Sequence, residues 1–315
     1  MAVALTRETT IAYLGPSGTF SEEALRSQED LADCRLVAMS TIADAIRACA
    51  TGAVDFAFVP IENSIEGSVS MTVDELIFGE ELFIQREVII DIHLDLLARS
   101  GVGVEQLHEV ISHPHALAQA RRFFQRELPN VITSVTNSTA EAARLVAESD
   151  RDDIAALAPP ITASIYGLHA LSRAVEDQLG NETRFVLIAP SRVPAPSGND
   201  RTALVCFQRS DHPGGLHQLL GIFASRSINL VRLESRPTKL GLGDYCFVIE
   251  LQGHISEPQV AAAITELYGE LASLRFLGSY PLSRPDPLEH VAERETEHLA
   301  AAAWLAALLA RVEES

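Results

Sequence analysis

The chain has 315 residues, of which 47% are hydrophobic and 21% are charged, and its formal net charge at pH 7 is -19. A chain of this length forms roughly two to three compact units, and the composition is that of a globular protein rather than a disordered one. Acidic residues outnumber basic ones 43 to 24, which argues against a nucleic-acid partner because phosphate binding needs a basic surface.

The N-terminus and the cysteines indicate the cellular compartment. Residues 1–10 lack the basic start and apolar block of a signal peptide, and no apolar run approaches the roughly 20 residues that span a bilayer. Cys34, Cys49, Cys206 and Cys246 are widely separated, without the spacing of metal ligands. We therefore expect buried free thiols in a cytoplasmic protein that has no membrane partner.

A short apolar strand at residues 11–14 is followed by a polar junction and then a helix. The junction is Gly15-Pro16-Ser17-Gly18, and the helix is predicted from Thr19 to about Gln28, with Thr19 and Glu22 at capping-box spacing. The free N–H groups of such a helix start form an anion site. The glycine turn has neither the ending of a phosphate loop nor the spacing of a dinucleotide fingerprint, so we expect no nucleotide cofactor.

Two further strands end in polar runs of the same kind. Residues 54–60 lead into Glu62, Asn63 and Ser64, a run that fits an ordinary turn with a helix cap equally well. Ser138 and Glu141 again have capping-box spacing, before a helix to about Glu148. In α/β proteins ligands bind beyond the carboxyl ends of strands. Three such junctions would hold an anion by backbone dipoles despite the negative net charge.

The segment from residue 84 to 166 continues the alternation of strands and helices. Residues 84–98 are strand-like, 110–112 form a strand, 116–128 a helix, 154–158 a strand and 161–166 a helix. His113 and His115 stand on either side of Pro114, but a third ligand at helical or hairpin spacing is missing. We therefore expect no metal site.

The polar strip Asn181-Glu182-Thr183-Arg184-Phe185 precedes the apolar strand 186–189. A hydroxyl beside a guanidinium pairs a proton donor with a carboxylate clamp, which suits chemistry on a small organic acid. Taken alone, the tripeptide from Thr183 to Phe185 fits an ordinary strand start, with the arginine in solvent and the phenylalanine in the core.

Prolines 190, 194 and 196 mark a linker. Beyond it the order is strand 202–208, helix 215–225, strand 230–235, strand 245–251, helix 258–271 and strand 274–280, which is the βαββαβ order of a ferredoxin-like sandwich. Residues 304–312 form an apolar helical stripe that predicts a terminal helix docked on the body or on a sister subunit.

Together these residues resemble the monofunctional bacterial prephenate dehydratases that carry a C-terminal ACT regulatory domain. The resemblance covers about residues 11–282. It rests on five motifs that occur in order along the chain: Gly15-Pro16-Ser17-Gly18-Thr19-Phe20-Ser21, Pro60-Ile61-Glu62-Asn63-Ser64 with Gly67, Ser112-His113-Pro114, Asn137-Ser138-Thr139-Ala140 and Asn181-Glu182-Thr183-Arg184-Phe185.

The resemblance implies an α/β fold with a two-lobed catalytic region of the periplasmic-binding-protein type (type II) and a ferredoxin-like ACT domain. The expected limits are 1–190 for the catalytic domain, 191–200 for the linker, 201–285 for the ACT domain and 286–315 for a helical tail. One lobe would comprise about 1–80 and 165–190, and the other about 81–164.

The family reaction converts prephenate to phenylpyruvate with loss of carbon dioxide and water, and needs no cofactor. The resemblance makes Thr183 the catalytic residue, hydrogen-bonded to the leaving hydroxyl. Arg184 and the backbone N–H groups near Ser17–Thr19 and Ser138–Ala140 would anchor the two carboxylates. The full expected substrate-binding set is Arg184, Phe185, Ser17, Thr19, Glu62, Asn63, Ser64, Asn137, Ser138 and Thr139.

In the family, an amino acid binds to the ACT domains where two of them pair, so L-phenylalanine is the expected effector and a homodimer or homotetramer the expected assembly. The expected effector site comprises two motifs: Gly214, Gly215, Leu216 and His217, and Glu234, Ser235, Arg236 and Pro237. Gly215 stands where the family usually has alanine.

Three alternatives remain. A dehydratase for arogenate, which carries an amino group in place of the keto oxygen, fits the same residues. A non-catalytic sensor of amino acids or organic acids is disfavoured by the Thr183-Arg184 pair. A chorismate mutase fusion is disfavoured because the dehydratase-like region begins near residue 11, and because the 286–315 tail is too short for a helical mutase domain.

Overall fold

The computed structural model describes residues 5–190, 192–239, 241, 243–284 and 304. Apart from Trp304, the helix predicted in the 286–315 tail lies outside these residues. Within the described part of the chain, no helix is both long and apolar enough to cross a bilayer.

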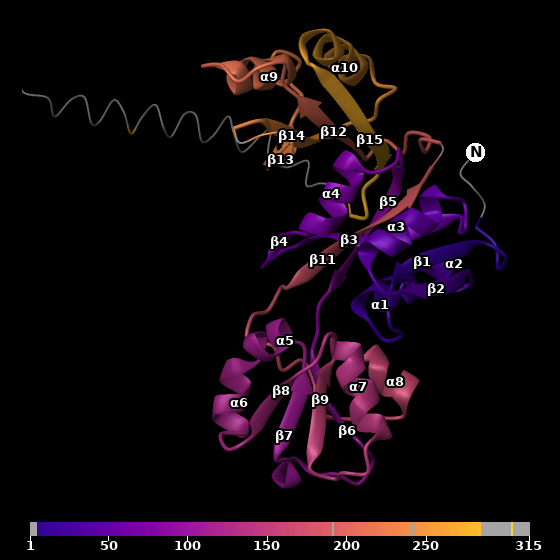
Figure 1. Cartoon of the computed structure of the whole chain (residues 1–315), viewed down its shortest axis with the longest axis vertical. Helices are drawn as coiled ribbons and strands as arrows, with labels where there is room; N and C mark the ends of the chain where they lie inside the picture. The colour runs from indigo at the N-terminus through magenta and orange to yellow at the C-terminus, as the bar shows by residue number, and fades with distance from the viewer. Residues whose placement is uncertain (1–4, 191, 240, 242, 285–303, 305–315) are drawn as a thin grey trace, which may run out of the picture. The chain divides into compact units, whose positions relative to one another are not determined.

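The first sheet is six-stranded, with the order β2-β1-β3-β11-β5 and with β4 paired to β3 (Figure 1). Its strands are β1 (Thr10–Leu14), β2 (Arg35–Met39), β3 (Phe56–Asn63), β4 (Gly67–Ser68), β5 (Phe83–Asp91) and β11 (Glu182–Ala189). The helices between them are α1 (Phe20–Arg26), α2 (Glu29–Ala32), α3 (Ile42–Ala50) and α4 (Ser70–Phe78).

The second sheet is five-stranded, with the order β10-β6-β9-β7-β8. Its strands are β6 (Asp95–Ala98), β7 (Glu109–Ser112), β8 (Ile132–Val135), β9 (Ile154–Ala158) and β10 (His169–Ser172). The 3-10 turn η1 (Val104–Gln106) and four helices accompany it: α5 (Pro114–Gln119), α6 (Arg121–Glu127), α7 (Thr139–Glu148) and α8 (Ile161–Tyr166). The helix predicted over 116–128 is thus two helices, which meet at Ala120.

The two sheets share one pattern of strand directions. In the first, β1 is parallel to β2 and β3, and β11 lies antiparallel between β3 and β5. In the second, β7 is parallel to β8 and β9, and β6 lies antiparallel between β9 and β10. Each antiparallel strand is supplied by the chain after it has left the other sheet. This confirms the predicted α/β region of two lobes.

The predicted division of the chain between the lobes was wrong at both crossings. β5 belongs to the first sheet because it pairs with β11 along its length, and β10 belongs to the second because it pairs with β6. The strand-like stretch 84–98 is therefore two strands of different sheets, separated by residues 92–94. β5 and β6 follow each other closely in one strand-like stretch, and the periodicity of the sequence does not report which sheet a strand joins.

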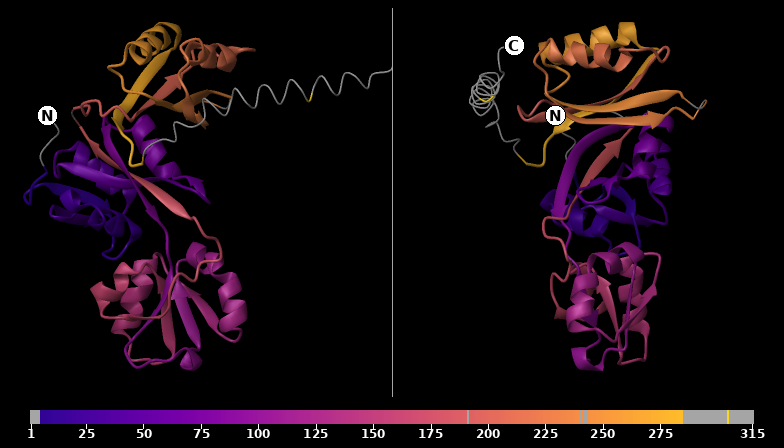
Figure 2. Two further views of the ribbon diagram at one scale, coloured as in Figure 1. Left: turned by 180° about the vertical axis from the view of Figure 1, so that it is seen from behind. Right: turned by 90° about the vertical axis from the view of Figure 1, so that its left-hand side faces the viewer.

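The C-terminal unit has the predicted βαββαβ order, with the strand order β13-β14-β12-β15. Its elements are β12 (Asp200–Phe207), α9 (Gly215–Ala224), β13 (Leu230–Pro237), β14 (Tyr245–Gln252), α10 (Pro258–Glu270) and β15 (Ser273–Pro281). Figure 2 shows α9 and α10 on the same face of this sheet. On that face Leu204 and Cys206 of β12 pack in one core with Leu219 and Leu267.

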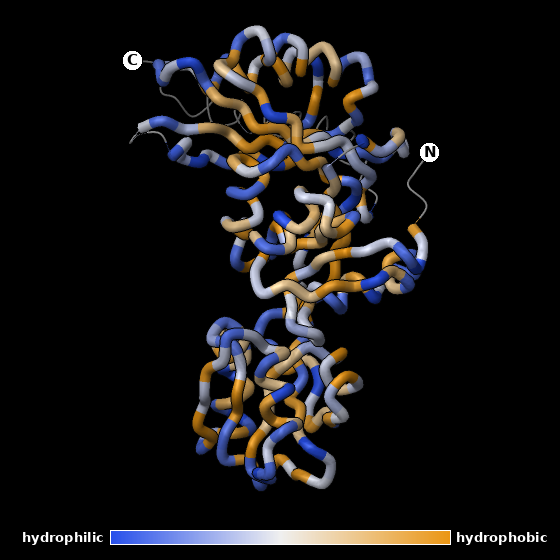
Figure 3. Tube along the Cα trace, turned by 45° about the vertical axis from the view of Figure 1, so that its right-hand side comes forward, coloured by the Kyte–Doolittle hydropathy of each residue, from blue (hydrophilic) through white to orange (hydrophobic). Residues whose placement is uncertain are grey.

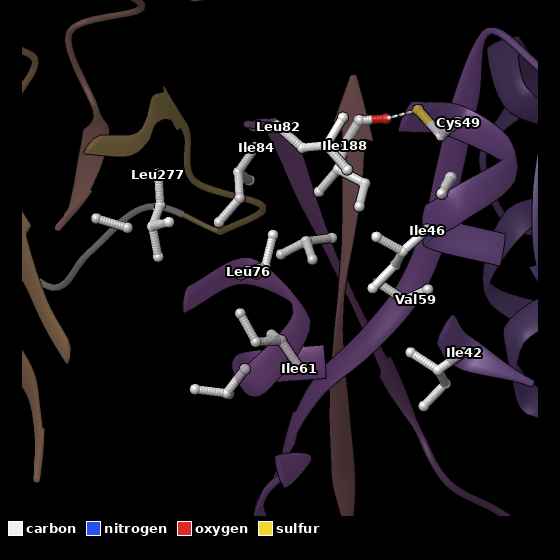
Figure 4. Packing of buried hydrophobic residues seen from close by; sticks show 14 of the residues in the cluster. Ile42, Ile46, Cys49, Val59, Ile61, Leu76, Leu82, Ile84, Ile188 and Leu277 are labelled. Atoms are coloured by element: carbon white, nitrogen blue, oxygen red, sulfur yellow. Dashed lines mark hydrogen bonds between the residues drawn. The ribbon is translucent and has the colours of Figure 1, made fainter. Parts of the chain in front are cut away.

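The other face of this C-terminal sheet shares a hydrophobic core with the first lobe. Ala203 and Val205 of β12, which alternate with the helix-facing residues, join Leu277, Leu76 and Ile84 in this core (Figure 4). Figure 3 shows hydrophobic residues, in orange, along the strands of the C-terminal sheet and of the first lobe. Because strand β12 is apolar on both faces, its sequence already requires cover on both sides.

The two chain segments that cross between the sheets are hydrogen-bonded to each other. His93 Nδ1 lies 2.7 Å from Glu176 Oε1, and the Leu94 N–H donates to Glu176 Oε2 at 2.9 Å. The Glu176 hydrogen bond raises the pKa of His93. Nearby on α1, burial raises the pKa of Glu23 to about 7, an effect that His93 opposes and Asp95 reinforces.

Glu23→Gln is expected to stabilise the protein at pH 8 but not at pH 5. The pKa of Glu23 is raised in the folded state, so its contribution to stability is complete below the unfolded-state pKa, near 4.5, and is lost as the pH rises through about 7. The uncharged amide avoids that loss. We expect a gain of about 1–2 kcal/mol in the free energy of unfolding at pH 8, discounted for partial solvent exposure.

Urea denaturation of the wild type and Glu23→Gln at both pH values measures this difference. Glu8→Gln, at an exposed turn, removes a carboxylate without this environment and serves as the control. An equal pH dependence in wild type and Glu23→Gln would refute the assignment.

Candidate active site

Thr183 lies on β11 directly opposite Asn63 of β3. Asn63 Nδ2 donates to Thr183 Oγ1 at 2.9 Å. The Asn63 Oδ1 atom accepts the backbone N–H groups of Ile65 and Glu66, both at 3.0 Å, which fixes the orientation of the amide. Because the Thr183 oxygen is used as an acceptor here, its own proton remains free to be donated to another group.

Asn63 ties three successive residues at the entrance of β11. Its Nδ2 also lies 2.8 Å from Asn181 Oδ1 and 3.1 Å from the Glu182 carbonyl oxygen. Asn181 Nδ2 in turn donates to Gln119 Oε1 on α5, at 3.3 Å. Sequence reasoning did not single out Gln119 for the site, because one glutamine on a short helix carries no pattern.

A β-bulge lies beside the Thr183–Asn63 pair. Arg184 pairs with Glu62, but Phe185 pairs with Pro60, so Ile61 is an extra residue on β3. Pro60 has no N–H to donate to a ladder, which is compatible with such an irregularity. Bulges re-aim side chains and are frequent next to active sites.

Arg184 points away from Thr183 because neighbouring side chains of a strand alternate between its two faces. The Arg184 side chain is buried, and its Nη2 lies 2.8 Å from Glu62 Oε2 and 2.9 Å from Glu250 Oε1. Its Nη1 lies 3.4 Å from Glu87 Oε2. This geometry does not support the expectation that Arg184 clamps a substrate carboxylate, because protein carboxylates already occupy the guanidinium.

Phe185, Glu62 and Ser64 also have structural partners. The Phe185 ring is 1% exposed and stacks on Phe58, with ring centroids 5.3 Å apart, so it belongs to the core rather than to a substrate surface. Glu62 binds Arg184. Ser64 Oγ accepts the Glu182 N–H at 2.9 Å and donates to the Gly180 carbonyl at 3.3 Å, which holds the loop against β11.

The junction before α1 differs from its prediction. Thr19 Oγ1 donates to the Leu14 carbonyl at 2.8 Å and does not cap the helix. The Gly18 N–H donates instead to Glu22 Oε2 at 2.8 Å. Burial alone would raise the pKa of Glu22, but the Gly18 N–H and Arg26 lower it. The Glu22 carboxylate thus occupies one of the N–H groups that we expected to bind an external anion here.

The junction before α7 confirms its prediction. Ser138 Oγ accepts the Glu141 N–H at 3.0 Å, and the Asn137 N–H donates to Glu141 Oε2 at 2.9 Å. Ser138 is the N-cap of a helix that runs from Thr139 to Glu148. The first N–H groups of this helix, which have no partner within it, therefore point towards its N-terminal end.

The first and third junctions lie against each other although they belong to different sheets. A Cβ atom on Gly18 would lie 2.8 Å from Thr162 Cγ2, 3.3 Å from Tyr166 Cε2 and 3.6 Å from Ala140 Cβ. Tyr166 Oη donates to the Ser17 carbonyl at 2.8 Å. Gly18 also has a φ of 91°, in the left-handed region. Both the close contacts and the backbone conformation therefore disfavour a side chain at this position.

The loop after Asn63 approaches the start of α5. Glu66 Oε1 lies 2.7 Å from His115 Nδ1, and the His115 ring stacks on His113 with centroids 5.3 Å apart. Burial lowers the pKa of His113. Within the described residues, no three potential metal ligands come together.

The two motifs expected to bind the effector flank one loop, residues 208–210. Gly214 caps α9 with a φ of 86°. A Cβ on Gly215 would lie 2.9 Å from Gln208 Nε2, so the side chain of Gln208 occupies the space of the alanine methyl. A cavity of about 540 Å³ is lined by Gln208 and Gly215, and one of about 380 Å³ by Gln208 and Ser235.

The second motif, residues 234–237, lies on β13, where successive side chains face opposite sides of the sheet. Ser235 and Pro237 are exposed, whereas Glu234 and Arg236 face the first lobe. Glu234 Oε2 accepts from Ser68 Oγ at 2.7 Å, and Arg236 Nη1 lies 3.3 Å from Asp74 Oδ1. Leu216 and His217 are exposed on the first turn of α9.

Comparisons with known proteins match both parts of the chain. A family model for prephenate dehydratase matches residues 11–192, and one for the ACT domain matches residues 202–267. A prephenate dehydratase of Amycolatopsis methanolica is 40% identical over 303 residues, which cover 95% of this chain and 97% of that protein.

Solved structures agree with these matches. The prephenate dehydratase of Arthrobacter aurescens, crystallised in complex with L-Phe, is 37% identical, with a TM-score of 0.83 and coverage of 96% of this chain and 99% of that one. GqqA, a quorum quenching acylase, is 29% identical, with a TM-score of 0.77 and coverage of 88% and 98%. The family models and the relatives agree along the chain, and this protein belongs to the prephenate dehydratase family.

Proposed function

We propose that this chain converts prephenate to phenylpyruvate, carbon dioxide and water, with Thr183 as the catalytic residue and L-phenylalanine as a feedback inhibitor. One observation carries the catalytic part: Asn63 donates to Thr183 Oγ1, which leaves the threonine proton available to the substrate. Asn63, the partner of Thr183, also binds Asn181 just before β11, and Asn181 binds Gln119 of α5. This chain of amide side chains offers donors and acceptors to a small acid with a hydroxyl group.

The enzyme must hold the substrate in a fixed orientation and supply a hydrogen-bond or proton donor to the leaving oxygen. The ring carboxylate leaves as carbon dioxide, and its bonding electron pair enters the ring as the carbon–oxygen bond at the opposite carbon breaks. The departing hydroxide takes up one proton and becomes water, and the product ring is aromatic. The Thr183 hydroxyl stabilises the departing oxygen by hydrogen bonding in the transition state. No cofactor is required.

The start of α7 is the best-supported anchor for a carboxylate. Ser138 caps this helix, and the first N–H groups beyond the cap carry the positive end of the helix dipole. We assign Asn137, Ser138 and Thr139 to substrate binding on this basis. Ser17 joins them, because its carbonyl is bound to Tyr166 close to Ala140.

The finer expectations on organisation have specific support. The four cysteines are buried and unpaired, as suits a reducing cytoplasm. The family models end near residue 192 and begin again at 202, in agreement with domain limits at 190 and 201. β13 is one of the two edge strands of its sheet and exposes Val231 and Leu233, which suits pairing with a second copy in a homodimer or homotetramer. A monomeric mass in sedimentation velocity would refute that assembly.

Turnover assays with the full chain test the function: phenylpyruvate absorbance measures the reaction of prephenate, and chromatography of L-phenylalanine, the amino product, measures the reaction of arogenate. The wild type is expected to turn over prephenate faster than arogenate, and saturating L-phenylalanine is expected to suppress the rate. A higher rate with arogenate would change the assigned substrate. An unchanged rate in the presence of L-phenylalanine would refute the proposed feedback inhibition. The absence of product from either acid would favour a non-catalytic ligand sensor over an enzyme.

A further inference from the structure

Glu250 of the ACT domain has an unusual concentration of partners. Its carboxylate lies 2.9 Å from Arg184 Nη2, 3.0 Å from Arg201 Nη1 and 3.0 Å from Arg232 Nη1, and the residue is 1% exposed. Burial alone would raise the pKa of Glu250, but the arginines lower it to about 2. The group is therefore a permanent anion at any physiological pH.

Arg184 connects Glu250 to the candidate active site. The same Nη2 atom that binds Glu250 also binds Glu62 Oε2, at 2.8 Å. Arg184 and Glu62 form one rung of the ladder between β11 and β3, and Thr183 and Asn63 form the adjacent rung. Arg184 and Glu62 thus join β11 to β3 one residue away from Thr183 and Asn63, and Arg184 is held in turn by Glu250 of β14.

The charges of this cluster are balanced. Arg184, Arg201, Arg232 and Arg236 face the carboxylates of Glu62, Glu87, Glu234 and Glu250, and Asp74 and Lys239 extend the network by one charge of each sign. Tyr280 Oη lies 3.5 Å from Arg184 Nη1. Loss of one carboxylate leaves a buried arginine without its full set of acceptors. An arginine that loses a carboxylate partner reorients towards the carboxylates that remain. For the loss of Glu250 this arginine is Arg184, which lies next to Thr183 on β11.

We infer that Glu250 is a positioning residue for the reaction at Thr183, so that the ACT domain supplies part of the catalytic apparatus itself. The inference rests on the proposed function. Glu250 acts through Arg184 and Glu62, which set the register and tilt of the rung next to Thr183 and Asn63. Misplacement of a catalytic group by about 1 Å costs roughly 10²-fold in rate, so a small shift of this rung has a measurable effect.

Glu250→Gln in the full chain tests the inference because it keeps the shape of the side chain and removes its charge. We expect kcat for prephenate to fall at least about tenfold, while KM stays within about threefold, because the substrate anchors at α7 are untouched. The control is Arg275→Gln. Arg275 also joins the ACT domain to the first lobe, but its hydrogen bonds go to the carbonyl groups of Ile77, Gly79 and Glu80, which lie outside β3 and β11.

The control is expected to keep kcat within about twofold of the wild type. If kcat of Glu250→Gln falls no further than kcat of Arg275→Gln, the inference is wrong. If the wild type forms no phenylpyruvate, the proposed function fails, and the inference fails with it. Activity in the wild type with an unaffected Glu250→Gln variant overturns the inference alone.

A double variant separates positioning from charge balance if Glu250→Gln folds poorly. Arg201→Gln combined with Glu250→Gln removes one charge of each sign and leaves Arg184 and Glu62 in place. We expect its melting temperature to recover towards that of the wild type while kcat remains low, because Arg184 still lacks its partner on β14. Recovery of both the melting temperature and kcat would show that Glu250 only balances charge.

Discussion

Thr183→Ala is expected to lower kcat for prephenate by roughly 10²–10⁴-fold, the range for loss of a positioned proton donor, with little change in KM. The hydroxyl is free to donate because Asn63 already supplies a donor to its oxygen. Its contribution rises only as negative charge develops on the departing hydroxide, so substrate binding does not depend on it. Steady-state kinetics by phenylpyruvate absorbance measure both constants.

Thr183→Ser is the matched control for this experiment. Serine keeps the hydroxyl, which accepts from Asn63, and removes only one methyl group from a residue that is buried. We expect Thr183→Ser to retain most of the activity that Thr183→Ala loses. A large rise in KM with a normal kcat in Thr183→Ala would instead make the threonine a binding residue.

Gly278→Ala is expected to lower the free energy of unfolding by about 2–5 kcal/mol, the sum of an overpacking and a backbone-strain cost. Gly278 lies on β15, where the ACT sheet meets β5 of the first lobe. A Cβ atom there would lie 2.7 Å from the Ile84 carbonyl oxygen and 2.9 Å from the Ile84 nitrogen. Both are backbone atoms and cannot turn aside, and the φ of 142° disfavours any side chain.

Gly269→Ala controls for the general effect of replacing glycine in the ACT domain. Gly269 is on α10, and a Cβ atom there would meet no atom within 4 Å. Alanine is the better helix former by about 1 kcal/mol, so Gly269→Ala is expected to be neutral or stabilising. Urea denaturation of both variants makes the comparison. Equal stability of the two would mean that β15 and β5 separate at little cost.

The regular elements were predictable where apolar periodicity and caps coincide. Residues 154–158 and 161–166 are the strand and the helix that the sequence indicates, and Ser138 caps α7 as its spacing with Glu141 predicts. The predicted cap at Thr19 failed because the Leu14 carbonyl competes for the threonine hydroxyl. A side chain with several acceptors in reach chooses among them by geometry, which spacing does not specify.

In the candidate site, too, the motif could be predicted from the sequence, but the partners of its side chains could not. The motif that contains Thr183 is recognisable in one dimension, but the expectation that Arg184 shares its site treated neighbours in sequence as neighbours in space. In a strand they face opposite ways. Arg184 therefore meets Glu62, Glu87 and Glu250, which lie far from it along the chain and carry no common motif.

By itself the sequence determined the family, the alternation of strands and helices, the βαββαβ unit and Thr183 as the candidate catalytic residue, because local propensity and compact motifs record these. Only the tertiary structure decided which sheet receives β5 and β10, that Asn63 holds the Thr183 hydroxyl, and that the ACT sheet shares a core and a buried charge cluster with the first lobe. These features depend on pairings between distant segments, which form according to burial and charge in three dimensions.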